Sequence, residues 1–209
     1  EELIDTVEQI MRDTGHEAIG LLSLSSRDYS QIGPLVQAIS NKYGDRALNI
    51  SLPSLRIESF SADLMEMLQG SRKASFTFAP EAATDRMREV INKYISTEDL
   101  LSTADEVFKR GWRLIKLYFM IGQPTETDAD VIAIAELAKQ VLQIGRKYHN
   151  NKAKVRVGVS TFVPKPHTPF QWAGLADLAG IRRKQALMRE AFGNTRGIIF
   201  NWNNPEETL

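Results

Sequence analysis

Apolar residues along this chain follow two spacings, short continuous runs and a repeat of three to four positions. The runs predict strands, and the wider spacing predicts amphipathic helices. Strands are expected over residues 16–24, 47–52, 74–79, 113–121, 155–162 and 197–202, and helices over 1–14, 32–44, 61–70, 84–93, 96–110, 128–148 and 178–192. Helix separates each predicted strand from the next at a repeat of about 30–40 residues, which is typical of a parallel sheet with helices outside.

A doubly wound sheet and a (β/α) barrel both fit this alternation. The barrel is favoured because polar, Gly and Pro residues gather after every predicted strand, where barrels place their sites. These clusters are residues 23–28, 51–56, 80–81, 122–126, 164–169 and 201–204. No G-x-G-x-x-G or P-loop motif marks a nucleotide-binding sheet. We therefore expect an α/β fold, a partial parallel barrel of the TIM type with about six strands.

One junction stands out, where an apolar run stops at Gly122 and Pro124 and a long helical pattern begins. Residues 114–121 are predicted to form a strand buried on both faces, as in parallel sheets. The Gly and the Pro form the turn, and Thr125 or Thr127 can cap the helix that follows. Such a junction brings bare backbone amides to the mouth of an α/β fold. Two acidic residues suit the positive end of that helix, Glu126 and Asp128.

Composition narrows the classes of protein. The 209 residues are enough for one domain, and 43% hydrophobic with 25% charged residues is normal for a globular protein. A net charge of zero gives no electrostatic argument for nucleic acid or membrane, and no apolar run approaches a bilayer span. Absence of Cys excludes disulfides and thiolate ligands within this sequence. Because the chain starts inside an amphipathic pattern, without Met or an export signal, we expect a fragment of a cytoplasmic protein.

Three segments, in order along the chain, resemble the core of radical S-adenosylmethionine (SAM) enzymes. Residues 76–93 resemble the region of the fourth barrel strand, residues 116–126 that of the fifth, and residues 160–170 that of the sixth. The resemblance covers nearly the whole chain. It is closest to an uncharacterised radical SAM group whose members often carry a cobalamin-binding-like domain upstream.

The fifth-strand segment is similar to a G-x-I-x-G-x-x-E motif of the family, with Ile121 and Glu126 at the spacing of the motif and Gly122 one position before its second Gly. The first Gly of the motif is absent, since Tyr118 or a neighbour stands there. In the family, residues at this turn contact adenine through the backbone, so the resemblance implies that role for the Ile and the Gly. It implies cofactor contact for Phe162 as well.

The resemblance also implies roles for two charged residues. Glu81 matches the position that contacts the SAM ribose hydroxyls, and Lys93 matches the position that contacts the methionyl carboxylate. A carboxylate accepts from two vicinal hydroxyls and an ammonium pairs with a carboxylate, so the chemistry agrees. The alternative interpretation is that the Glu caps a helix and the Lys is solvated. Ser25, Ser26 and Asp28 stand where the family meets the SAM amino group, although a solvent-exposed turn is the simpler interpretation.

One departure from the family dominates. Its defining Cys-x3-Cys-x2-Cys loop, which holds a 4Fe–4S cluster, follows the first strand, and this chain has no Cys. The chain begins at a helix like the one after that loop, so the resemblance implies that the first strand and the cluster loop lie outside residues 1–209. Cluster binding needs thiolates. We therefore expect this single-domain fragment to bind no cluster, to hold SAM weakly or not at all, and to be inactive.

For the whole protein, the resemblance implies an oxygen-sensitive enzyme that uses SAM and a 4Fe–4S cluster. It would cleave SAM reductively to a 5′-deoxyadenosyl radical, with electrons from a donor such as flavodoxin or ferredoxin. The substrate stays open among RNA, protein and small molecules, and so does the reaction subclass. An open barrel edge also predicts dimerisation.

Two other functions stay in play. One is a different barrel enzyme that uses Glu81, Glu126 or Asp28 as acid and base, and the other is a non-catalytic scaffold. His167 has no second His or Cys nearby in sequence, so no metal site is expected there. Two aromatic residues of the same loop are expected to pack against it, Phe170 and Trp172.

Overall fold

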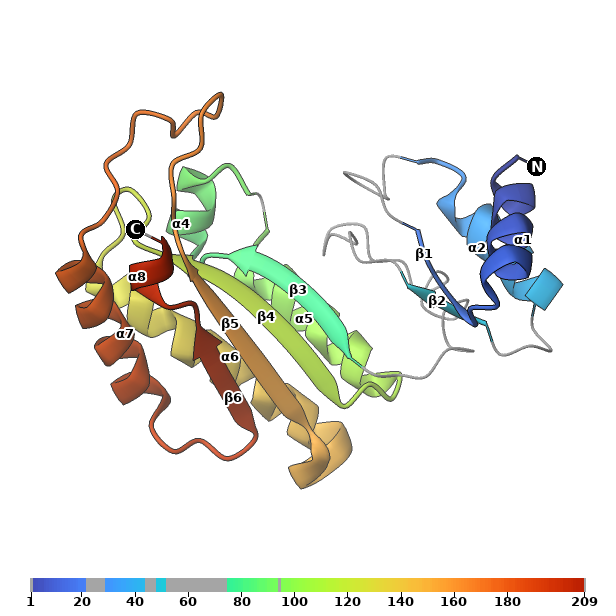
Figure 1. The fold of residues 1–209 in the computed structure, drawn as a ribbon. Helices are drawn as coiled ribbons and strands as arrows, with labels where there is room; N and C mark the ends of the chain where they lie inside the picture. The colour runs from blue at the N-terminus through green and yellow to red at the C-terminus, as the bar shows by residue number, and fades with distance from the viewer. Residues whose placement is uncertain (1, 22–28, 44–47, 52–74, 94, 209) are drawn as a thin grey trace. The chain divides into compact units, whose positions relative to one another are not determined.

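The computed structural model describes residues 2–21, 29–43, 48–51, 75–93 and 95–208. They belong to two compact units, Glu1–Lys73 and Ala74–Leu209, each with its own contacts (Figure 1). Each unit is described by itself, and the expectation of a single domain over residues 1–209 stays a prediction.

The first unit is a small βα layer. Its elements are α1 (Glu2–Thr14), β1 (Ala18–Gly20), α2 (Ile32–Tyr43) and β2 (Asn49–Ser51). The two strands pair in parallel, as a helical crossover requires. Apolar side chains of both helices and both strands form its core, with Val7, Val36, Ile39 and Ile50 buried. These four elements confirm the predicted ones, and the helix predicted over 61–70 lies outside the described residues.

The second unit contains a four-stranded parallel sheet. Its strands are β3 (Phe76–Glu81), β4 (Leu114–Ile121), β5 (Lys154–Thr161) and β6 (Ile198–Trp202). They lie side by side in sequence order, each hydrogen-bonded to the next. A barrel wall has this sequential order, whereas a Rossmann sheet reverses its order at a switch point.

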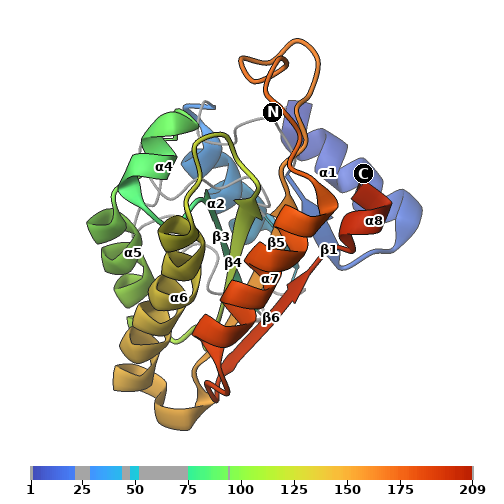
Figure 2. The same ribbon diagram turned by 90° about the vertical axis from the view of Figure 1, so that its left-hand side faces the viewer.

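Helices follow every strand of this sheet. They are α4 (Asp85–Val90), α5 (Thr97–Lys109), α6 (Asp128–His149), the 3₁₀ turn η5 (Asn150–Lys152), α7 (Leu178–Phe192) and the short α8 (Pro205–Thr208). Figure 2 shows α5, α6 and α7 side by side on one face of the sheet. A doubly wound fold would cover both faces, so the arrangement confirms the barrel-type prediction.

Alternation along β4 decides which face is buried. Ile115, Leu117, Phe119 and Ile121 are all but fully buried against the helices, whereas Tyr118 is 46% exposed. The prediction of a strand buried on both faces is therefore wrong. In a barrel wall only the outer face packs on helices, and the polar residues within this apolar run lie on the inner face.

Side-chain caps fix where two of the helices begin. Ser96 caps α5 by accepting from Asp99 N, and Thr127 caps α6 in a reciprocal capping box with Asp130. Of the two threonines that the sequence offered as the cap of α6, Thr127 is the cap and Thr125 is not. α6 extends for 22 residues because its apolar stripe is continuous and Asn150 ends it with a positive φ of 49°.

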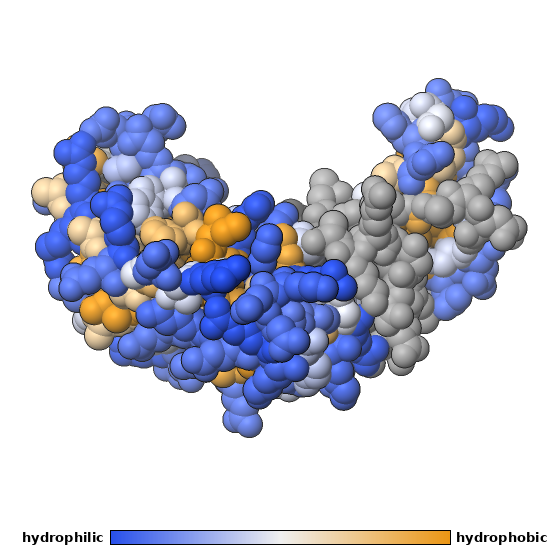
Figure 3. All heavy atoms as spheres, turned by 90° about the horizontal axis from the view of Figure 1, so that it is seen from below, coloured by the Kyte–Doolittle hydropathy of each residue, from blue (hydrophilic) through white to orange (hydrophobic). Residues whose placement is uncertain are grey.

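The surface of the second unit is mostly hydrophilic where Figure 3 presents it, with scattered apolar islands. Among the described residues no helix is both long and apolar enough to cross a membrane.

Asp130 joins the loop after β3 to the start of α6. Its carboxylate, 8% exposed, accepts from Thr84 Oγ1 at 2.7 Å and from Thr127 Oγ1 at 2.6 Å, and it pairs with Arg86. Burial opposes ionisation, but the hydrogen bonds outweigh it and lower the pKa of Asp130 from 3.8 to about 2. The carboxylate therefore stabilises the fold in its charged form.

We predict that Asp130→Asn lowers the free energy of unfolding by about 1–2 kcal/mol at pH 7. Because the folded pKa is depressed, this contribution is complete above pH 4 and disappears as the pH falls towards about 2. Urea unfolding at pH 7, 4 and 3 should show the two proteins converging in stability. Glu89→Gln, which neutralises an exposed carboxylate on α4, is the control. An equal loss at every pH would contradict the linkage.

Candidate functional site

Backbone strain gathers at the carboxyl ends of three adjacent strands. A residue other than Gly has a positive φ at the end of β3 and in the loops after β4 and β5, namely Glu81 (65°), Thr125 (64°) and His167 (62°). Such conformations persist only where the surrounding structure holds them, and they are common at binding sites. The edge of the sheet where the polar clusters were predicted is therefore the candidate site.

Glu81 and Lys93 face each other at this edge. Glu81 is the last residue of β3, after a register shift against β4, and Lys93 follows the end of α4. Lys93 Nζ lies 3.6 Å from Glu81 Oε1, and the two side chains are 29% and 28% exposed. This separation exceeds the hydrogen-bond range, so both groups keep capacity for a ligand.

The environment of the Glu81 carboxyl group partly disfavours its ionised form. Burial raises the pKa of Glu81, and the ammonium of Lys93 opposes that rise. Thr84, not Glu81, caps α4, since its Oγ1 accepts from Met87 N. The alternative interpretation was that Glu81 caps a helix and that Lys93 is solvated. It does not hold, because Thr84 is the cap and the Lys93 side chain is only 29% exposed.

Gln123 joins the ends of β3 and β4. Its Nε2 donates to Glu81 O at 2.9 Å and to Met120 O at 3.3 Å, and the residue is 4% exposed. Its Oε1 is buried and has no hydrogen-bond partner among the described residues. A buried acceptor left over at a strand end is suited to a donor from a bound molecule or a further loop.

Gly122 makes the turn after β4 that was predicted. Its φ is 82°, and its N–H donates to Glu126 Oε1 at 3.0 Å. Glu126 in turn pairs with Lys184 of α7, and the two side chains are only 4% and 11% exposed. Glu126 therefore fixes the turn and is not available as an acid or base. Asp128 pairs with Arg183.

Buried hydrogen bonds from Arg88 hold the chain segments next to Glu81 and Lys93 in place. Its side chain is 1% exposed and donates to the carbonyls of Ala82, Ala83 and Ile95 at 2.6–3.1 Å, besides pairing with Asp85. Arg88 could not be recognised from the sequence as a buried residue of the site, because an Arg on a short helix is normally exposed. It fixes both chain segments that flank the Glu–Lys pair.

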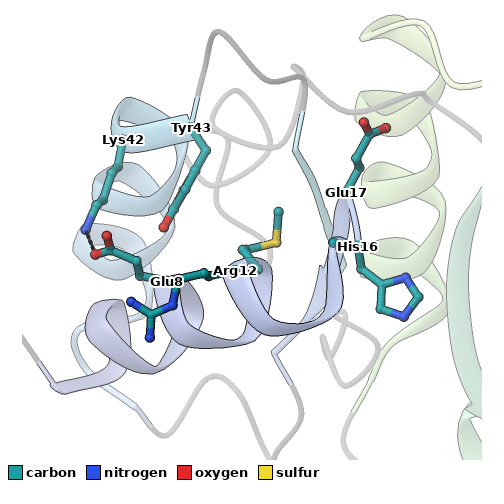
Figure 4. A pocket seen from close by; sticks show the side chains of 8 residues that line it. Glu8, Arg12, His16, Glu17, Lys42 and Tyr43 are labelled. Carbon is teal, nitrogen blue, oxygen red and sulfur yellow. Dashed lines mark hydrogen bonds and ion pairs between the residues drawn. The ribbon is translucent and has the colours of Figure 1, made fainter.

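A hollow of about 670 Å³ lies in the first unit, between α1 and α2 (Figure 4). Lys42 Nζ and Glu8 Oε2 form an ion pair across it at 2.6 Å. Because that pair satisfies both charges, the strand ends of the second unit remain the stronger candidate. Within the described ranges, no three His, Cys, Asp or Glu residues lie close enough to hold a metal ion.

This chain matches a known protein family. A family model described as the Radical SAM superfamily matches residues 1–138. The chain belongs to the radical SAM superfamily. This confirms the resemblance drawn from the strand-end motifs.

One curated relative is the uncharacterized protein MJ0966 of Methanocaldococcus jannaschii, 37% identical over 153 residues, which is 73% of this chain and 31% of that protein. The chain thus spans about a third of that relative. Among solved structures, Streptococcus suis SuiB bound to S-adenosylmethionine matches 96% of this chain and 43% of its own, with a TM-score of 0.60 and 13% identity. A second SuiB structure matches with a TM-score of 0.59. At this identity the likeness shows the fold alone.

The sequence-predicted site residues of this radical SAM chain divide into three groups. Glu81, Lys93, Ile121 and Gly122 meet at one edge, joined by Gln123. Ser25, Ser26 and Asp28 lie outside the described residues.

Phe162 belongs to the third group. It is hydrogen-bonded to Ile121 O through its N–H, is buried, and packs edge-on against Phe170. The packing role expected of Phe170 is confirmed. The packing role expected of Trp172 is wrong, since its side chain is 89% exposed.

Gly122→Ala tests whether this turn is crowded. An added Cβ would lie 2.7 Å from Ile181 Cδ1 and 3.2 Å from Ala176 Cβ, besides the strain of a positive φ. Gly15→Ala is the matched control, with a φ of 67° and open space around it. We expect the control to lose about 1 kcal/mol, and Gly122→Ala to lose about 1–3 kcal/mol more from overpacking. Equal losses in urea unfolding would contradict the crowding.

Proposed function

We propose that this chain forms the SAM-binding wall of a radical SAM enzyme, with Glu81 and Lys93 holding the cofactor. The observation that carries the proposal is the half-buried pair at the end of β3, with its atoms 3.6 Å apart. Glu81 would accept from the two ribose hydroxyls, and Lys93 would pair with the methionyl carboxylate. The fold relative SuiB binds SAM, which supports the same use of this wall.

The residues present fit such a cofactor. The Glu81–Lys93 pair offers one acceptor and one cation without a tight mutual hydrogen bond. The turn at Gly122 would present backbone to adenine, as would the strand end at Ile121 and Phe162. Bound SAM supplies the adenosyl group for radical chemistry, and the role of these side chains is to bind and orient it.

A 4Fe–4S cluster does not fit the residues of this sequence, because it contains no Cys. We propose that thiolates outside residues 1–209 hold the cluster in the whole protein, and that this chain alone is inactive. Electrons would come from a small donor such as flavodoxin or ferredoxin, in the cytoplasm. The possible contact of Ser25 and Ser26 with the SAM amino group remains part of this proposal.

Loss of either charge should weaken SAM binding. In the full-length protein with its cluster reconstituted, we expect Glu81→Gln and Lys93→Met each to raise the Kd for SAM about 10- to 100-fold. Each change removes a charge-assisted hydrogen bond of about 1.5–3 kcal/mol. Titration calorimetry under nitrogen measures the affinity directly.

The controls change the same charges elsewhere. Glu89→Gln on α4 and Lys147→Met on α6 neutralise exposed side chains and should leave the Kd unchanged. If Glu81→Gln and Lys93→Met bind SAM as tightly as these controls, the assignment of the two residues is refuted.

Radical chemistry of the whole protein has its own test. The protein, purified without oxygen and given dithionite and SAM, should release 5′-deoxyadenosine, measured by liquid chromatography. A preparation with a spectroscopically intact cluster that yields none, with or without candidate substrates, would favour the barrel scaffold over the enzyme.

A further inference from the structure

The face of the β3–β6 sheet opposite the helices carries a polar cavity of about 300 Å³. Lys116 and Arg156, register partners on β4 and β5, both line it. The other polar side chains of its lining are Tyr118, Ser160, Asn201 and Asn203. This cavity lies within one unit and is separate from the Glu81–Lys93 pair.

Two positive charges meet in this cavity without a counter-charge. Adjacent strands are about 4.8 Å apart, so cations on register partners repel each other. No lining residue is acidic, and no carboxylate pairs with Lys116 or Arg156 within the part of the chain that the structure describes. A bound anion would relieve that repulsion.

Gly158 keeps the cavity open. It is the register partner of Tyr118, and a Cβ added to it would lie 2.8 Å from Tyr118 Cε1. The Tyr118 ring therefore packs against Gly158, which has no side chain. A side chain at position 158, which lines the cavity, would displace that ring.

The cations lie below the proposed SAM site. Lys116 is the register partner of Thr77, whereas Glu81 is the partner of Phe119, three residues further along β4. Three residues of strand span about 10 Å. A molecule held at Lys116 would thus reach from there towards the mouth where SAM is proposed to bind.

We propose that Lys116 and Arg156 bind the phosphate of a small phosphate-ester substrate. Two cations match a phosphate dianion, the guanidinium can donate two parallel hydrogen bonds to it, and the hydroxyl and amide side chains suit the rest of a polar molecule. The inference rests on the proposed function only in treating the bound molecule as the substrate of the SAM-dependent reaction.

Chemical footprinting of the full-length protein, without SAM, tests the anion site. Lys116 is acetylated with acetic anhydride, and mass spectrometry reads the rate at each lysine. About 50 mM phosphate, against chloride at equal ionic strength, should slow acetylation of Lys116 about sixfold if the Kd for phosphate is near 10 mM. Exposed Lys147 and Lys152 should react equally in both salts.

Variants of Lys116 and Arg156 test whether these cations bind an anion or instead stabilise the fold. In low-salt buffer without phosphate, Lys116→Met and Arg156→Met should not lower the urea midpoint, because each relieves repulsion. Arg156→Met should abolish the phosphate protection of Lys116. The double variant Lys147→Met/Lys152→Met, which also removes two cations, should retain it.

A crossed design keeps this proposal distinct from SAM binding. Glu81→Gln should weaken SAM affinity yet leave the phosphate protection of Lys116 intact, and Arg156→Met should do the reverse. Protection by succinate or an RNA oligonucleotide but not by phosphate would overturn the phosphate assignment. A lower urea midpoint in Lys116→Met, with no phosphate protection in the parent, would overturn the site and leave the SAM proposal untouched.

Discussion

The two-residue period of a parallel sheet is the constraint on which this structure depends. Among the described residues of this unit, helices pack on one face of β3–β6, so every second residue of β4 and β5 is committed to the core. The residues between them are released from packing and can be polar. The same register that buries Ile115 and Leu117 therefore places Lys116 and Tyr118 on the opposite face. Core and polar cavity are two consequences of one pattern of hydrogen bonds.

At the carboxyl edge, the structure stabilises strained backbone with buried polar groups. Arg88 fixes the loop after β3, Gln123 joins the ends of β3 and β4, and Glu126 with Lys184 holds the turn at Gly122. Arg88 and Gln123 bond mainly to backbone carbonyls, and Glu126 accepts from the Gly122 N–H. A buried donor or acceptor without its partner is costly. The position of Glu81 is thus set by neighbours that need not touch a ligand.

Element positions could be predicted from the sequence because apolar spacing and caps are local signals. The strand over 113–121 and the helix over 128–148 were correct within a residue or so at each end. The burial of that strand was not, since spacing alone does not say which face meets helices, and Lys116 and Tyr118 were the overlooked clue. Glu81 and Lys93 were found through family motifs. Arg88, Gln123 and Lys184 were not, because their roles depend on contacts between distant segments. The exposure of Trp172 also could not be predicted, since aromatic rings usually pack.

The contact between the Tyr118 ring and Gly158 has a consequence for recognising related proteins. The first Gly of the family motif is absent from this strand, where Tyr118 or a neighbour stands, and that looks like a defect when the position is compared alone. Across the sheet a glycine does stand beneath the ring, since Gly158 on the neighbouring strand is the register partner of Tyr118. Relatives that differ at one of these positions should differ at the other. We therefore expect the pair, not the single position, to change between related barrels.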